Sequence, residues 1–195
     1  MPRSLTPDEP GDDLDDLPDT HPPHPVHYAE QALLGALLLE PHRLTDAAGI
    51  EPDSFSNYAH GALFAAIRAL PAPDLNQHAK DTNWLNAVLA AAREHARGLT
   101  ASYLHTLVQV CPWSRHASAY ARMIETEHAR RTLRAHAERL VLTTTDVTLP
   151  YPVSDTLAAA NALAAAVDDI AARFPPHSGS LPRTPTPAVR PPQTP

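Results

Sequence analysis

Alanine and leucine dominate the sequence between about residue 24 and residue 174, where β-branched and aromatic residues are scarce. Alanine and leucine are strong helix formers, whereas strands favour β-branched and aromatic side chains. Apolar residues in this region recur at steps of three and four, which is typical of helices packed on other helices. We therefore predict an all-α fold: a small globular helical bundle over residues 24–112, followed by a long helical hairpin over residues 113–174.

The two ends of the chain differ from this middle region. Residues 1–23 contain seven carboxylate side chains and little apolar material, and residues 175–195 contain eight prolines. Neither end has enough hydrophobic side chains to offset the entropy lost on ordering. We predict a disordered acidic N-terminal tail and a disordered proline-rich C-terminal tail.

Charge and cysteine content exclude several classes of protein. The net charge is −7, and the acidic tail alone carries seven negative charges, so the folded part is near neutral and has no field that would attract nucleic acid. A lone cysteine, Cys111, excludes a disulfide framework and a cysteine metal cluster. No signal peptide fits the N-terminus, and no apolar run reaches the length of a membrane span. We expect a cytoplasmic protein without a cofactor.

The first predicted helix runs from Val26 to Glu40 and is ended by Pro41, which cannot continue the hydrogen-bond ladder. Glu30 and Gln31 are expected on its solvated face rather than as a catalytic pair. Gly35 costs about 1 kcal/mol relative to alanine in a helix interior. It therefore predicts the close approach of a neighbouring helix at that position.

Further helices follow along the chain. Ser56 or Asn57 can cap a helix that Pro71 stops, and two more helices are predicted before Pro112. One charge-laced helix of roughly 28 residues is expected from Ser114. After a break, a last helix is expected over residues 154–174.

No catalytic or metal site is predicted. His21, His24 and His27 could in principle meet one zinc ion, but the prolines between them favour extended backbone and no further ligand is positioned to complete the site. His60 is expected to cap or orient the helix that it begins. Cys111 lies at an apolar helix end and is expected to be a buried, inert thiol.

Several segments, in order, resemble the N-terminal domain of DnaB-type replicative DNA helicases. They are "HYAEQALLGALLLEPHRL", "IEPDSFSNYAHGALFAAIRAL", "YLHTLVQVCPWSRHASAYARMIETEHARRTLRAHAERL" and the final helix. Asp53, Phe55 and His60 match the family's loop and the start of its next helix, and Tyr120 with Ala121 matches the step into its arginine-rich helix. The stretch over residues 71–98 departs from the family's pattern.

A helicase of this family also needs a nucleotide-binding motor, whose phosphate loop reads G-x-x-x-x-G-K-[ST]. The chain contains one lysine, Lys80, and no pair of glycines brackets it. We therefore expect no ATPase activity by that mechanism, and helicase activity only if a separate motor chain is supplied.

The resemblance implies a role in assembly. In the family, N-terminal domains pair through their helical hairpins, form a ring, and help to bind primase and loader proteins. For this chain it implies a homodimer or higher homo-oligomer and a partner such as primase, replicative helicase or loader. A two-helix hairpin cannot bury both sides of its apolar seam alone, so a partner surface is also expected on physical grounds. The predicted interface residues are Leu133, Ala137, Leu140, Leu163, Val167, Ile170 and Phe174.

An alternative is a DNA-binding or regulatory protein that uses the arginine-rich helix over residues 122–139. Arginine pairs well with phosphate, and the candidate contacts are Arg130, Arg131 and Arg134. Glutamates interleave with these arginines, which favours ion pairs within the helix instead. An unrecognised helical enzyme, for which no site can be nominated, and a gene remnant that folds but does little are the other readings.

Overall fold

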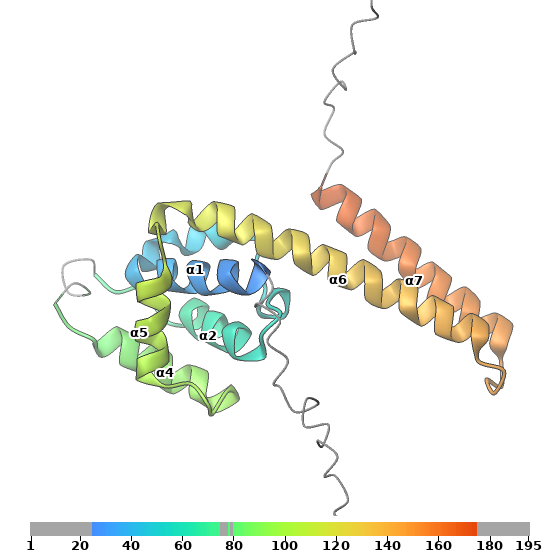
Figure 1. Cartoon of the computed structure of the whole chain (residues 1–195), viewed down its shortest axis with the longest axis horizontal. Helices are drawn as coiled ribbons and strands as arrows, with labels where there is room; N and C mark the ends of the chain where they lie inside the picture. Colours follow the sequence, from blue (N-terminus) through green and yellow to red (C-terminus); the bar gives the residue numbers. More distant parts are fainter. Residues whose placement is uncertain (1–24, 75–77, 79, 175–195) are drawn as a thin grey trace, which may run out of the picture. The chain divides into compact units, whose positions relative to one another are not determined.

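The computed structural model describes residues 25–74, 78 and 80–174, and both predicted tails lie outside these ranges. Within them the regular structure is entirely helical, which confirms the predicted all-α class (Figure 1). The chain divides into two compact units at His128 and Ala129. We describe each unit by itself.

The first unit is built around α1 (Pro25–Leu39), which packs against α2 (Tyr58–Ala69) and α5 (Ala101–Val110). α4 (Asn83–His95) packs on α2 and α5. The described residues of the unit also form three 3₁₀ turns: η1 (Pro41–Ala47), η2 (Pro52–Ser54) and η3 (Ser114–His116). Every residue of α1 from Ala32 to Leu38 is buried, so this part of the helix is surrounded by protein on all sides.

The expectation that Glu30 and Gln31 face solvent is wrong. Glu30 is fully buried and Gln31 is half-buried. The reason is that α2, α5 and η3 all pack on α1, and the Glu30 side chain faces His60 of α2. An isolated helical pattern does not reveal how many neighbours the helix will have.

The helix ends follow local chemistry. The Asn57 side chain accepts a hydrogen bond from the Ala59 N–H at 2.8 Å, so the predicted cap of α2 is confirmed. The long helix α6 (Ala117–Thr145) follows η3. α7 (Pro152–Arg173) begins two residues before the predicted start at Ser154, because proline is well suited to the first turn of a helix.

The division between the units falls inside α6, beyond the predicted boundary at residue 112. Ala117, Ala121 and Ile124 in the first turns of α6 are buried in the core of the first unit. These turns therefore belong to the bundle.

The second unit contains a helical hairpin, made by the rest of α6 and by α7 (Figure 1). The Thr156 hydroxyl donates a hydrogen bond to the Thr143 carbonyl at 3.2 Å and ties the start of α7 to the end of α6. Ala159 is buried, and the half-buried residues of α7 recur from it at steps of three and four. This spacing is typical of a helix that packs along another helix.

A buried polar network joins α1, α2 and α5 in the first unit. The His60 ring donates from Nδ1 to Glu30 Oε2 at 2.6 Å, and its Nε2 lies 2.5 Å from the Tyr103 hydroxyl. The Ser56 hydroxyl donates to Glu30 Oε1 at 2.7 Å, and the Ser56 backbone N–H donates to the same oxygen. His60 is thus fully buried and links three helices. It orients its helix, as one of the two predicted roles has it, whereas Asn57 and not His60 is the cap.

The network keeps the Glu30 carboxylate ionised inside the core. Burial alone would raise the pKa of this carboxyl group, but the hydrogen bonds from His60 and Ser56 outweigh burial and hold the pKa below its ordinary value. A buried carboxylate without such partners would be strongly destabilising. The partners on α2 and α5 are therefore fixed in position relative to α1.

Gly35 lies where α1 meets α5, as its position in the helix predicts. A Cβ atom at this position would lie 2.1 Å from the Leu107 carbonyl oxygen and 2.8 Å from Cys111 Cβ. Because the first of these is a backbone atom, no side-chain rotation can make room. The predicted close approach is confirmed.

We expect Gly35→Ala to destabilise the first unit by about 1–3 kcal/mol, because the overpacking of the α1–α5 contact exceeds the helix-propensity gain of alanine. Urea unfolding followed by circular dichroism measures this change. Gly98→Ala is the matched control, since a Cβ there meets nothing within 4 Å. Equal stabilities of the two variants would contradict the close approach.

We expect Glu30→Gln to lower the free energy of unfolding at neutral pH by about 1–3 kcal/mol, because a hydrogen-bonded buried charge is removed. The folded-state pKa of Glu30 lies below the unfolded value, so its contribution to stability is present above about pH 4.3 and is lost as the pH falls through the folded pKa. The gap between wild type and variant should therefore narrow in acid. Unfolding curves at several pH values test this, with the exposed Glu94→Gln as control; a constant gap would refute it.

Candidate protein-interaction surfaces

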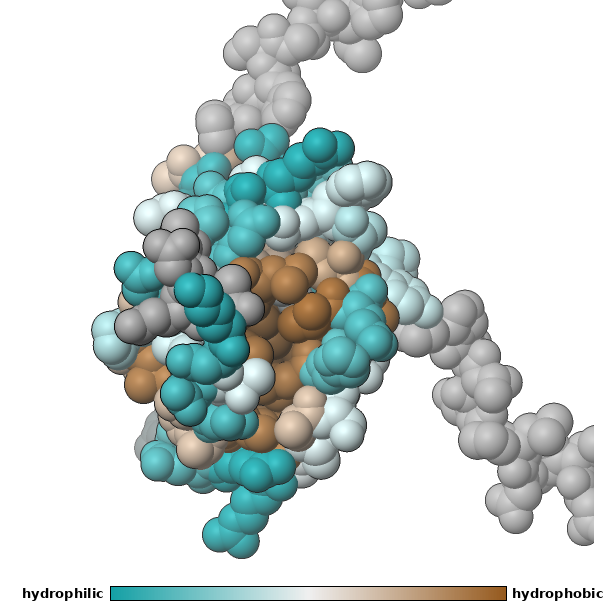
Figure 2. Space-filling model, turned by 90° about the vertical axis from the view of Figure 1, so that its left-hand side faces the viewer, coloured by the Kyte–Doolittle hydropathy of each residue, from teal (hydrophilic) through white to brown (hydrophobic). Residues whose placement is uncertain are grey.

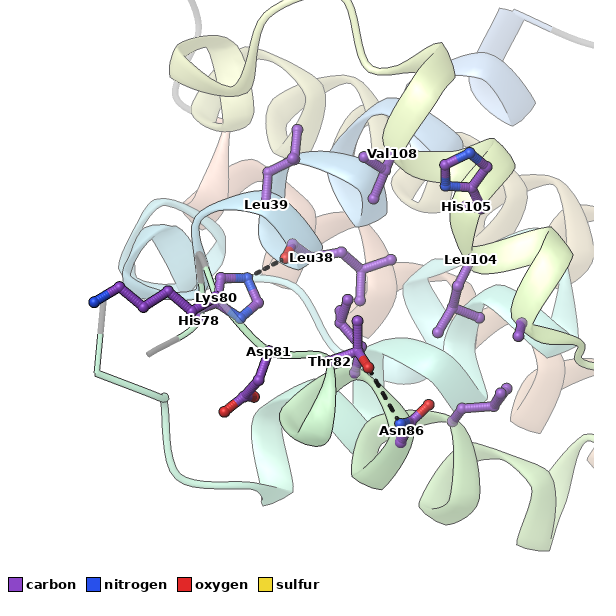
Figure 3. Close-up of a pocket in the computed structure, with 13 residues that line it drawn as sticks. Leu38, Leu39, His78, Lys80, Asp81, Thr82, Asn86, Leu104, His105 and Val108 are labelled. Carbon is purple, nitrogen blue, oxygen red and sulfur yellow. Dashed lines mark hydrogen bonds between the residues drawn. The ribbon is translucent and has the colours of Figure 1, made fainter. Parts of the chain in front are cut away.

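An apolar groove opens on the face of the first unit that carries α4 and α5. Figure 2 shows an apolar hollow framed by polar residues on this side of the molecule. The groove has a volume of about 750 Å³. Its apolar walls come from the end of α1, from α4 and from α5 (Figure 3): Leu38, Leu39, Leu85, Leu89, Leu104 and Val108.

Polar side chains surround these walls. Lys80 carries a positive charge, Asp81 carries a negative charge, and His78 and His105 contribute imidazole rings. The His78 Nε2 atom donates a hydrogen bond to the Leu38 carbonyl at 2.8 Å (Figure 3), whereas its Nδ1 atom is buried without a hydrogen-bond partner. Such an unpaired ring nitrogen is uncommon in a folded protein.

The groove was not predicted from the sequence. Leu85 and Leu89 are four residues apart and read as an ordinary core stripe. Only the packing of α4 and α5 at the end of α1 leaves part of that stripe open. Seven of the lining residues fall in the stretch over residues 71–98, which departs from the family's pattern.

A second apolar surface lies on the hairpin. Large apolar side chains on α7 are exposed at Val153, Leu157 and Val167, with exposed fractions of 72%, 59% and 46%. They follow steps compatible with one helical stripe. On α6, Val141 and Leu142 are also exposed.

The predicted interface residues differ in their exposure to solvent. Two are exposed, Ala137 and Val167. The others are half-buried in the hairpin unit: Leu133, Leu140, Leu163, Ile170 and Phe174. Their role in association remains a prediction. The most exposed apolar positions of α7, Val153 and Leu157, were not among them.

The candidate nucleic-acid contacts lie on α6 in the second unit. Arg130 and Arg134 are exposed and Arg131 is half-buried. Arg130 and Arg131 each have an interaction within the protein. Their contact with phosphate remains a prediction.

A cluster of titratable groups in the first unit has the composition of a possible metal site. Ligand atoms of His27, Glu30 and His60 lie within 4.8 Å of one another. However, both nitrogens of His60 and both oxygens of Glu30 are already hydrogen-bonded, to each other and to Tyr103 and Ser56. The cluster is therefore arranged as a structural cross-link between helices. His21 and His24 lie outside the described residues.

Cys111 is half-buried, and burial raises the pKa of its thiol. A raised pKa disfavours the reactive thiolate at neutral pH. The inert character predicted for this residue is therefore supported, although its burial is only partial.

Among the described residues, no helix combines the length and the apolar character that a membrane span requires.

Comparison with known proteins gives a consistent result. The family model "DnaB-like helicase N terminal domain" matches residues 21–126. The replicative DNA helicase DnaB of Geobacillus stearothermophilus is 34% identical over 106 residues, which cover 54% of this chain and 23% of that protein. The chain thus spans less than a quarter of the length of this relative, and the match does not include its ATPase motor domain.

A solved structure agrees on the fold. The crystal structure of the N-terminal domain of DnaB helicase from Mycobacterium tuberculosis matches with a TM-score of 0.54 and 24% identity, covering 69% of this chain and 96% of that one. The family model spans more than half of the present sequence, over the bundle whose geometry is described above. The chain belongs to the family of DnaB-like helicase N-terminal domains.

Proposed function

We propose that this protein is a non-catalytic module of DNA replication that associates with itself through its helical hairpin and binds replication partner proteins. The candidate partners are primase, replicative helicase and helicase loader. The observation that carries the proposal is the exposed apolar stripe of α7, on a chain of the DnaB N-terminal domain family.

Energetics support association through this stripe. Full burial of a valine or leucine side chain is favourable by roughly 1.5–3 kcal/mol. Val153, Leu157 and Val167 are each about half exposed or more, so most of this gain is unrealised in the single chain. A second hairpin that covers them would recover it. The alanines of α7 would also allow close approach of two helices.

The proposed module works without chemistry of its own. The chain has one lysine and no phosphate loop around it, and its buried Glu30–His60–Tyr103 network is closed by internal hydrogen bonds. Its effect on replication would come from which proteins it holds together.

We expect the full chain to be a dimer or larger in solution, and Val153→Glu with Leu157→Glu to dissociate it. Two charges on the apolar stripe would have to be desolvated in the interface, which is unfavourable. Light scattering over at least a tenfold range of concentration measures the mass. Circular dichroism should be unchanged, because both side chains are exposed.

Ala158→Glu with Ala162→Glu is the matched control, because it adds the same charge at exposed positions on a different face of α7. It should leave the mass unaltered. A wild-type chain that stays monomeric at every concentration, or a control that dissociates equally, would refute association through this stripe.

A further inference from the structure

We propose that the groove between α1, α4 and α5 binds the acidic N-terminal segment of this same chain, the stretch "DDLDDLPD" over residues 12–19, with Leu14 and Leu17 placed against its apolar walls. The proposal does not depend on self-association or on a replication partner.

The walls of the groove are apolar, so an occupant with apolar side chains would bind there most favourably. Leu39 is 42% exposed, and Leu85 and Val108 are half-buried, so the walls are only partly covered within the first unit. Leu14 and Leu17 are three residues apart, close enough in sequence to enter one hollow together. A hollow of about 750 Å³ is in the range that binds a compact apolar group.

Charge favours this segment in particular. Five aspartates flank the two leucines: Asp12, Asp13, Asp15, Asp16 and Asp19. The groove carries the only lysine of the chain, Lys80, which can pair with one of these aspartates; one carboxylate, Asp81, also lines it. A backbone N–H of the segment could also donate to the unpaired Nδ1 atom of His78, whose Nε2 already donates to Leu38.

The connection is long enough. The acidic segment precedes α1, and the groove begins at the end of α1, where Leu38 and Leu39 lie. The 14 steps from Pro25 to Leu39 span about 21 Å along the helix. The eight steps from Leu17 to Pro25 reach up to about 26 Å when extended, and those from Leu14 reach further. The segment can therefore span the length of α1.

The C-terminal end of the chain is a poorer occupant. Residues 175–195 contain two arginines, Arg183 and Arg190, and no carboxylate side chain. Their charge would repel Lys80. They also contain only one leucine, Leu181, so the paired apolar side chains are missing.

If the N-terminal segment occupies the groove, any other ligand of the groove must compete with that segment. An apolar segment of another protein could enter only by displacing Leu14 and Leu17. The acidic tail would then set a threshold for binding at this face.

Site-specific photo-crosslinking of the full chain tests the proposal. The photoreactive residue p-benzoylphenylalanine replaces Leu17 in one variant and Leu5, which lies in the same tail without adjacent carboxylates, in a matched control. Mass spectrometry locates the crosslinks, and an equal mixture of ordinary and isotope-labelled chains separates bonds within one chain from bonds between chains. We expect the position-17 probe to crosslink α4 and α5 residues of the groove within its own chain, and the position-5 probe to do so several-fold less.

Two further substitutions, each made in the chain that carries the probe at position 17, test the apolar and the charged contacts separately. Leu14→Asp should reduce groove crosslinks about tenfold or more, because one of the two apolar contacts is lost. Lys80→Glu, at an exposed position that cannot act by unfolding the core, should reduce them by roughly twofold to fivefold. Crosslinks that avoid the groove, that form equally from position 5, or that join different chains would overturn the proposal.

Discussion

The pairing of one buried carboxylate controls the arrangement of the first unit. Glu30 is fully buried, and an ionised carboxylate in such a place must have its oxygens satisfied. His60 and Ser56 satisfy them from the side of α2, and Tyr103 extends the chain of hydrogen bonds to α5. A second contact depends on the absence of a side chain: Gly35 lets the backbone of α5 approach α1 closely. These two contacts fix how α5 lies against α1, and hence where the groove opens beside the end of α1.

The proposed function depends on surfaces. The sequence has no phosphate loop around its single lysine, and the buried titratable groups are closed into a hydrogen-bonded network. Two apolar surfaces are open among the described residues: a groove on the bundle and a stripe on α7 of the hairpin. Each lies within one compact unit. The two surfaces could therefore bind different partners, one hairpin to another and a short apolar segment to the bundle.

The sequence predicts well what depends on local chemistry. Alanine and leucine content predicted the helical class, the pair Ser56 and Asn57 predicted a cap that Asn57 provides, and the cost of Gly35 predicted a close helix contact. The order of short segments predicted the family. Prediction from the sequence failed for Glu30 and for the burial of His60, residues that local patterns suggest to be a surface glutamate and a helix-end histidine. Their partners are 26 to 43 residues away in sequence, and no local pattern announces such a contact. The groove was missed for the same reason, because it depends on which part of a core stripe is left uncovered.

The central claim is that this chain binds proteins of the replication machinery rather than performing a reaction. The most direct test is the solution mass of the full chain mixed with the DnaB-type replicative helicase and, separately, with the primase of the same organism. The account predicts a defined complex with at least one of them, larger than either component alone. Elution and mass that equal the sum of unmixed components, for both partners and at every concentration tested, would contradict it.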